Sequence, residues 1–578
     1  MKTHLKTTFR VVLTLLLMLG LCFGSGMARS EELYNGIVLP EQWPPDYGDL
    51  THEPMRVPYL DSPPKVISID VGRQLFVDDF LIEQTTLNRT FHLGSYHSQN
   101  PILKPDRSWE QEPWDQETRS RPSPTAMVFS DGVWYDPKDH LFKMWYMGGS
   151  RKSTCYATSQ DGISWQKPIL DVMPGTNMVH TRSHDSTTVW IRDSATVWLD
   201  HAAENPAARF KMFSIYRDRS KEHYGCSVFL SPDGIHWGQP LAETKSLGDR
   251  TTVFYNPFRR KWVYSIRCSA SGIEYMGRSR QYREHDDPVA GAQWTDAEAP
   301  LWVGADKYDL PLPEVEFDND GRKMVAQLYN LDAVAYESLM LGLFTIWPGQ
   351  PKDRAKPNYV CLGFSRDGFH WHRPDHRPFV GVSERHGDWN WANVQSAGGG
   401  CLVVGEKLYF YVSGRAGVKG SGESGVCTTG LATLRRDGFA SMDAGESEET
   451  LTTRPVRFTG KHLFVNAEAG EGELRAEVLD EAGKVIAPFT RDNCVAVTGD
   501  GTLQPVTWKG ADDLSQLADR PVAFRFYLRK GRLYAFWVSP DRSGASQGYV
   551  AAGGPGLTGP RDTLGSKAYE AARAIGQQ

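Results

Sequence analysis

The chain has 578 residues, of which 40% are hydrophobic and 11% aromatic, so it can build more than one domain. Its 64 basic and 70 acidic residues give a net charge of −6 without a basic run, which argues against nucleic acid as a partner. Of the 8 cysteines, those other than Cys22 are odd in number and lack C-x-x-C spacing, which argues against a disulfide framework or a cysteine zinc site.

The N-terminus has the features of an export signal. Basic residues precede an apolar stretch, residues 11–22, that is too short to span a bilayer, and Gly26-Met27-Ala28 offers small residues for cleavage. We expect residues 1–28 to be a signal peptide and the mature chain to be secreted or periplasmic, without a membrane span. A lipid anchor on Cys22 is the alternative, although Leu21 before it is larger than lipoprotein processing normally accepts.

Residues 29–65 are rich in proline and lack periodicity, which predicts an extended lead-in. The next apolar stretch, residues 74–82, predicts a strand. We expect it to be an outer strand of the last unit in the repeat that follows.

A turn of sequence S-x-D-G-x-x-W recurs along the middle of the chain. Its aspartates are Asp161, Asp233 and Asp367, and a worn copy contains Asp437. The spacings are 72, 134 and 70 residues, so one degenerate unit lies between Asp233 and Asp367 and five units result. The Asp-Gly pair favours a tight turn and the Trp can fill the gap between units, so we interpret the motif as structural.

Each unit also contains a predicted hairpin of two apolar strands with a turn rich in Asp, Asn, Pro or Gly. The hairpins join residues 133–137 to 142–146, 197–200 to 210–213, 253–257 to 262–264, 315–318 to 323–325, and 401–403 to 408–411. Strands that are apolar on both faces fit small sheets packed between neighbours. We therefore predict an all-β protein with a five-bladed β-propeller over residues 66–445.

After residue 450 the repeat ends and short alternating strands follow, at residues 463–466, 473–479 and 523–528. This pattern predicts a C-terminal β-sandwich over residues 446–560, followed by a tail over residues 561–578. Helix is expected only near residues 565–575.

Several of these segments resemble a known family. They are Leu75-Phe76-Val77-Asp78-Asp79, Asn100-Pro101-Ile102-Leu103, the F-K-M-W-Y hairpin, the repeat turns, and the stretch from Gly460 through Glu477. The chain resembles secreted bacterial proteins similar to glycoside hydrolase family 32, within the five-bladed β-fructosidase and arabinanase superfamily. The resemblance covers residues 65–556 and implies a propeller that acts on carbohydrate. The N-D-P-N-G, R-D-P and E-C segments of fructosidases are absent, so no catalytic role is carried over.

Candidate site residues follow from position. In such a propeller, residues before the first strand of a blade and after its second strand share one rim. There we expect Glu337 as general acid, Asp249 as base or nucleophile, and Asp193 as the partner that orients and shifts their pKa values. Capping of strand ends by Asp193 and Asp249 is the structural alternative. The expected substrate-binding residues are Arg121, Asp185, Arg250, Arg267, Asp306, Asp309, Asn393 and Gln395.

Some questions stay open at this point. Asp185 and Asp193 begin similar segments, so either residue fits the inward position of the second unit. Arg250 and Arg267 suit an acidic sugar or sulfate as well as a salt bridge. No paired histidine spacing indicates a metal site, and no cofactor is expected, although a structural Ca²⁺ in the channel is compatible with the resemblance.

The sequence therefore predicts a secreted glycosidase that cleaves a poly- or oligosaccharide. The main alternative is a non-catalytic carbohydrate-binding propeller. A sialidase-like enzyme is a third, because the repeat turn distantly resembles an Asp-box. The sequence leaves the glycan, the stereochemical outcome and the oligomeric state undetermined.

Overall fold

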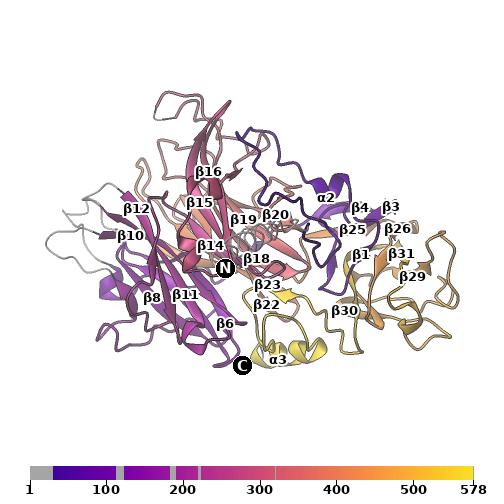
Figure 1. Ribbon diagram of the computed structural model, residues 1–578. Coiled ribbons are helices and arrows are strands. Elements are labelled where there is room, and N and C mark those ends of the chain that lie inside the picture. Colours follow the sequence, from indigo (N-terminus) through magenta and orange to yellow (C-terminus); the bar gives the residue numbers. More distant parts are fainter. Residues whose placement is uncertain (1–29, 112–122, 182–189, 219–222, 319, 577–578) are drawn as a thin grey trace, which may run out of the picture.

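The computed structural model describes residues 30–111, 123–181, 190–218, 223–318 and 320–576 (Figure 1). The predicted signal peptide, Arg121 and Asp185 lie outside the described residues. Strands dominate, as predicted for an all-β protein, and the α-helices in these ranges are α2 (Pro58–Asp61) and α3 (Ser566–Gly576). None of the described helices has the length and apolar character needed to cross a membrane.

The middle of the chain forms small antiparallel sheets in sequence order. Sheets 1 and 2 contain β6 (Ala126–Asp136), β7 (Leu141–Gly148), β8 (Ser153–Ser159) and β9 (Met178–Thr181), then β10 (Trp190–Leu199), β11 (Phe210–Asp218), β12 (His223–Ser231) and β13 (Ala242–Glu243). Sheet 3 contains β14 (Thr252–Asn256), β15 (Lys261–Ser271), β16 (Tyr275–His285) and β17 (Leu301–Val303). Sheet 4 contains β18 (Gln327–Glu337), β19 (Leu339–Trp347) and β20 (Tyr359–Ser365). Sheet 5 contains β21 (Asn393–Ser396), β22 (Leu402–Val404), β23 (Lys407–Arg415) and β24 (Cys427–Arg435).

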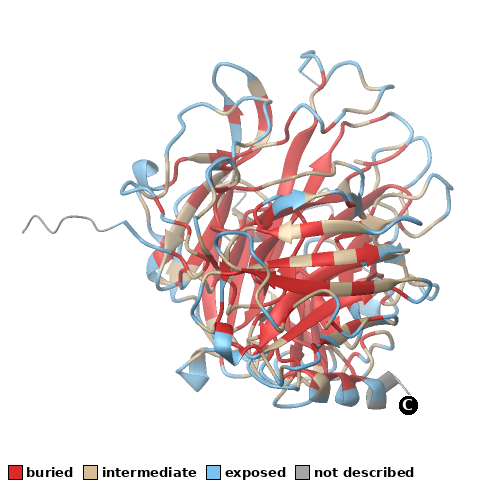
Figure 2. Cartoon of the chain, turned by 90° about the vertical axis from the view of Figure 1, so that its right-hand side faces the viewer, coloured by how far each residue is buried: buried red, intermediate tan, exposed pale blue. Residues whose placement is uncertain are grey.

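These sheets contact one another in a circle. β6 contacts β10, β10 contacts β14, β14 contacts β18, β19 contacts β21, and β21 contacts β6. Aromatic side chains fill the spaces between them, since the rings of Trp134 and Trp198 lie 4.6 Å apart and those of Trp198 and Trp262 lie 5.8 Å apart. The strands are buried on both faces (Figure 2), which explains their nearly continuous apolar sequences.

The repeat turn is a structural element, as its composition predicts. In the third clear copy, Asp367 Oδ1 accepts hydrogen bonds from the backbone N–H groups of Phe369 and His370 at 2.9 and 2.8 Å. Gly368 has φ +82°, and a Cβ there would lie 2.1 Å from Nδ2 of Asn256 in sheet 3. The turn therefore fixes the spacing between neighbouring sheets as well as its own backbone.

We predict that Gly368→Ala lowers the free energy of unfolding by about 2–4 kcal/mol, because positive φ and overpacking each cost about 1–3 kcal/mol. Gly175→Ala is the matched control, since Gly175 has φ +81° and no other atom lies within 4 Å of the position that a Cβ would take. Denaturant unfolding of both variants measures the difference. Equal losses would mean that the contact with Asn256 adds nothing.

The fourth predicted hairpin is wrong. Residues 315–325 form only an isolated bridge between Phe317 and Lys323, and the true hairpin of sheet 4 is β18–β19. The Asp320-Gly321 turn resembled a hairpin turn, whereas the actual turn at Glu337 and Ser338 carries no Gly, Pro, Asn or Asp. This displacement matters because Glu337 was placed relative to it.

Two further sheets pack face to face at the other side of the molecule (Figure 1). Sheet 6 contains β30 (Asp500–Val506), β28 (His462–Glu468), β32 (Gly531–Ser539), β25 (Ala440–Ala444), β4 (Asn88–Phe91) and β2 (Gln74–Leu75). Sheet 7 contains β29 (Glu473–Leu479), β31 (Ala523–Arg529), β26 (Glu449–Thr453) and β3 (Ile82–Thr85). They share one hydrophobic core, in which Phe536 of sheet 6 contacts Phe524 and Phe526 of sheet 7.

Short strands from both ends of the chain connect the two groups of sheets. β5 (Ser95–Tyr96) joins β24 at the outer edge of sheet 5, and β33 (Tyr549–Val550) joins β18 of sheet 4. Residues 74–82 were expected in this outer position, but they contribute β2 and the start of β3 to sheets 6 and 7 instead. A short parallel pair, β1 (Ile67–Ser68) with β27 (Val456–Arg457), adds to this connection.

Candidate functional site

Irregularities interrupt three of the inner strands near their starts. The register of the strand pairs shifts between Met127 and Gly132, between Arg192 and Ser194, and between Leu328 and Asn330. The residues that leave the ladder include Asp131, Asp193 and Tyr329. Since a bulge redirects the side chain of the extra residue, neighbouring sheets aim polar groups at one region. We call this region the axial site.

Asp131 and Arg192 form a fully buried ion pair in the axial site. Burial raises the pKa of Asp131 to about 6, although the neighbouring Arg192 and Arg250 oppose the increase. Asp131 Oδ2 and Arg192 Nη1 have no hydrogen-bond partner in the described structure. The carboxyl group of Asp131 can therefore carry a proton below about pH 6. Asp131 Oδ2 and Arg192 Nη1 can each form a hydrogen bond with a further group.

Arg250 connects three sheets. Its Nη2 donates to Ser130 Oγ at 2.9 Å and to Asn330 Oδ1 at 3.1 Å, and its guanidinium lies 3.8 Å from the ring centroid of Phe129. Arg250 itself has φ +60°, a conformation that costs free energy outside glycine. Arg250 therefore lies in the axial site, and a role for it in substrate binding stays a prediction.

Asp332 of β18 is a further buried carboxylate beside Arg250. It accepts hydrogen bonds from Ser396 Oγ at 2.6 Å and Asn330 Nδ2 at 2.8 Å. Burial raises its pKa, while the charge of Arg250 opposes the increase. Asp332 therefore joins sheets 4 and 5 to the group.

Asp193 and Asp249, both predicted catalytic residues, each form an ion pair with an arginine, and both affect the pKa of Tyr224. Asp193 pairs with Arg151 at 3.2 Å, and Asp249 pairs with Arg267, another predicted site residue, at 3.3 Å. Burial raises the pKa of Tyr224, and the charges of both aspartates raise it further, which places the two carboxylates near one hydroxyl. Asp249 is the more accessible, with 27% of its side chain exposed against 6% for Asp193.

Sheet 5 completes the axial site. Gln395 Nε2 donates to Asn393 Oδ1 at 2.8 Å, and Asn393 Nδ2 donates to the backbone oxygen of Lys356 at 2.6 Å. Lys356 Nζ in turn reaches the hydroxyl of Tyr329 at 3.5 Å. Burial alone would raise the pKa of Tyr329, but the positive charges of Lys356 and neighbouring arginines lower it below its usual value.

The structure places Glu337 at the opposite end of the inner strands, so the expectation that it shares a rim with Asp249 is wrong. It ends β18, seven residues beyond Asn330, which corresponds to about 20 Å along a strand. Tyr549, its partner in β33, contacts the backbone of Pro257 in the β14–β15 turn, far from the start of β14. The misplaced fourth hairpin caused the error.

Glu337 belongs to a buried ion-pair network instead. Its carboxylate contacts Arg73 at 3.5 Å and Arg436 at 3.1 Å, and accepts a hydrogen bond from Ser546 Oγ at 2.7 Å. Arg436 also pairs with Asp562 at 3.0 Å. Burial raises the pKa of Glu337, although both arginines oppose the increase. The residue is satisfied by its neighbours and serves the contact between the two groups of sheets.

We predict that Glu337→Ala lowers the free energy of unfolding by about 3–5 kcal/mol, because it leaves two buried arginines short of a counter-charge. Glu337→Gln keeps the shape and part of the hydrogen bonding, and should lose less. Urea unfolding measures both losses. If Glu337→Gln instead leaves stability intact and removes an activity of the folded protein, Glu337 has a chemical role after all.

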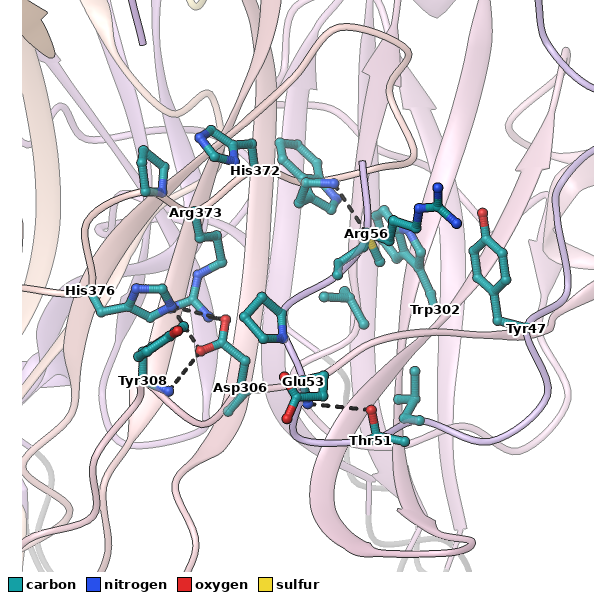
Figure 3. A pocket seen from close by; sticks show the side chains of 18 of the residues that line it. Tyr47, Thr51, Glu53, Arg56, Trp302, Asp306, Tyr308, His372, Arg373 and His376 are labelled. Atoms are coloured by element: carbon teal, nitrogen blue, oxygen red, sulfur yellow. Dashed lines mark hydrogen bonds and ion pairs between the residues drawn. The ribbon is translucent and has the colours of Figure 1, made fainter. Parts of the chain in front are cut away.

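Asp306 and Asp309 lie apart from the axial site. Asp306 lines a pocket of about 990 Å³ between the lead-in and the outer edges of sheets 3 and 4 (Figure 3). Arg373 donates to both oxygens of Asp309 at 2.6 Å, and His376 lies 2.9 Å from Asp306. The ligand atoms of Asp306, Asp309 and His376 are within 4.8 Å of one another, a spacing that suits a metal ion. Since the guanidinium already neutralises these carboxylates, we interpret the group as structural.

Sequence reasoning missed three central residues, Asp131, Tyr329 and Asp332. Asp131 lies two residues before the Val133-Trp134 pair of its inner strand, and Asp193 lies four residues before the Val197-Trp198 pair of the next inner strand. That shared pattern was a usable signal. Tyr329 and Asp332 gave none, because the inner strand of sheet 4 was not recognised.

No family model and no curated protein matches the sequence. Among solved structures, the chain is similar to an N-acetylgalactosamine deacetylase from F. plautii, at 14% identity and a TM-score of 0.35 over 58% of this chain and 97% of that one. It is also similar to a fructofuranosidase from Schwanniomyces occidentalis, at 12% identity and a TM-score of 0.34 over 75% and 98%. An endo-arabinase from Bacteroides thetaiotaomicron gives 10% identity and a TM-score of 0.33 over 54% and 95%. We base the function on the site's own residues.

Proposed function

We infer that the circle of sheets 1 to 5 is a five-bladed β-propeller and that sheets 6 and 7 form a β-sandwich. The closed order of contacts between neighbouring sheets supports the first, and the shared core of the two facing sheets supports the second. In this arrangement the axial site is the end of the channel where the inner strands begin.

We propose that the protein is a secreted glycoside hydrolase that cleaves a poly- or oligosaccharide at the axial site. The observation that carries the proposal is the presence of carboxylates from neighbouring sheets in different environments at one end of the ring. Asp131 is buried and has a raised pKa, whereas Asp249 is partly exposed and paired with Arg267. Glycosidic cleavage needs such a difference, because one carboxyl group must donate a proton while another is ionised.

The roles follow from these environments. Asp131 replaces Glu337 as the group that holds the proton for the departing oxygen. Asp249 is the base or nucleophile, because it is ion-paired and accessible. Asp193 orients the site through Arg151, Asn393 and Gln395 bind hydroxyl groups of the substrate, and the buried Arg250 adds positive potential beneath it.

A non-catalytic carbohydrate-binding protein is the second candidate, and the pocket in Figure 3 favours it. Tyr47 and Tyr308 line that pocket with more than half of each side chain exposed, and Trp302 lies in its wall. Exposed aromatic faces suit sugar rings without any chemistry at the axial site. Binding of a glycan without turnover, unchanged by substitutions in the axial site, would identify this function.

We predict that Asp249→Asn lowers kcat on the cleaved glycan by about 10²–10⁴, the usual contribution of a positioned acid or base. A panel of glycans identifies the substrate, and reducing-end release measures turnover. Asp286→Asn is the control, since Asp286 is an exposed partner of Lys261 on sheet 3. Full turnover by Asp249→Asn would remove Asp249 from the mechanism.

We predict that activity falls as the pH rises above about 6, because the raised pKa of Asp131 means that the carboxyl loses its proton in this range. The pH dependence of kcat/KM measures this alkaline limb. Asp131→Asn should lower the activity and flatten the limb, since the amide has no proton to lose. An alkaline limb that persists unchanged in this variant would exclude Asp131 as the acid.

A further inference from the structure

Among the residues that the structure describes, the positive charges of the axial site exceed the negative ones. Asp131, Asp193 and Asp249 each pair with an arginine of their own, namely Arg192, Arg151 and Arg267. Four more cations remain around them, and none forms an ion pair with a carboxylate among the described residues: Arg250, Arg280, Lys356 and Arg415. Asp332 is the nearby carboxylate left to balance them, and it is shared with Ser396 and Asn330.

These cations use neutral partners. Arg280 donates to the backbone oxygens of Arg250 and Tyr329, and Arg415 Nη1 donates to Ser424 Oγ at 3.0 Å. The guanidinium groups of Arg250 and Arg415 both lie against the ring of Phe129, at 3.8 and 5.4 Å from its centroid. Aromatic faces and carbonyl oxygens stabilise a cation only in part, so net positive charge remains.

Several donors at this position are left without partners. Nε and Nη1 of Arg250 and Nε of Arg415 are buried and make no hydrogen bond in the described structure. Arg250 is 2% exposed, and leaving a buried charged group unpaired is unfavourable unless a ligand compensates it. The lowered pKa of Tyr329 reports the same excess of positive charge.

The cations are graded in accessibility. Arg250 and Arg280 are fully buried, whereas Lys356 and Arg415 are half-buried. Both half-buried residues lie near Tyr329 and Asn393, and the charge of the partly exposed Asp249 also acts on Tyr329. A ligand in the axial site can therefore reach Lys356 and Arg415, with the two buried arginines adding positive potential beneath. Guanidinium and ammonium groups in this arrangement suit a carboxylate or a sulfate.

We propose that the axial site recognises an anionic substituent on the saccharide, a uronate carboxylate or a sulfate ester, through Lys356 and Arg415. The inference rests on the proposed function for the location of the saccharide but not for its cleavage. A neutral saccharide would leave the excess charge uncompensated, which makes the substituent a determinant of specificity.

The test uses the full-length mature protein and three probes of similar length: a neutral galactan oligosaccharide, an oligogalacturonate and a sulfated galactan oligosaccharide. Isothermal titration measures affinity at two salt concentrations, and chromatography of the same mixtures detects cleavage. Lys356→Met and Arg415→Met remove one charge each while keeping most of the side-chain volume. Arg415→Lys restores the charge, and Lys261→Met, at an exposed ion pair on sheet 3, is the control.

We expect at least one anionic probe to bind about tenfold or more tightly than the neutral one, with the difference shrinking at high salt. Lys356→Met and Arg415→Met should each lose about tenfold for the anionic probe and less than about twofold for the neutral one. Arg415→Lys should recover part of the loss, and Lys261→Met should change neither. The two anionic probes distinguish carboxylate from sulfate.

Equal affinity for neutral and anionic probes, or an anionic preference unchanged by both methionine substitutions, would overturn the inference. Anionic binding that depends on Lys356 without any cleavage would support it and count against hydrolysis. Cleavage of the neutral probe by the wild-type protein, with no preference for either anionic probe, would support hydrolysis and count against the inference. Thermal unfolding checks that each variant is folded. If Arg415→Met does not fold, Arg415→Lys and Lys356→Met still decide the test.

Discussion

The contact between the two groups of sheets depends on a set of buried charges. Arg73, which directly precedes β2 of sheet 6, pairs with Asp437 at 2.8 Å and lies 3.5 Å from Glu337 at the end of β18. Asn466 of β28 donates to Asp437 at 2.9 Å, and Arg436 pairs with Asp562 of the C-terminal segment. All the charged members are fully buried, so removal of any one of them leaves a buried partner without its opposite charge. The network specifies one relative placement of the sheets, which a purely apolar contact would define less sharply.

Much of the fold follows from sequence because its units repeat. Four of the five predicted hairpins are present, since turn residues such as Asp136-Pro137 and Asn256-Pro257 separate strands that are apolar on both faces. The repeat turn was interpretable because Asp367 and Gly368 act within a few residues of each other. Local chemistry repeated several times is the easiest information to recover from one sequence.

The short strands β5 and β33, which connect the two groups of sheets, could not be predicted in this way. The pairing of Tyr549 with Glu337, and of Tyr96 with Ala432, depends on contacts between residues hundreds of positions apart. The same limit applies to the site. Asp193 and Asp249 could be assigned to this end of the ring because each precedes an inner strand predicted from sequence, whereas Asp332 lies inside a strand that was not predicted. A single displaced hairpin moved the predicted acid to the wrong end of the ring.

Completion of sheets 4 and 5 by strands from both ends of the chain also affects how the protein reaches its native state. Sheet 5 lacks its outer strand without Ser95–Tyr96, and sheet 4 lacks an edge partner until Tyr549–Val550 has been made. A nascent chain thus cannot complete sheet 4 before nearly all of it has left the ribosome. Contacts of such long sequence separation slow folding, which leaves the chain incompletely folded for longer during its synthesis.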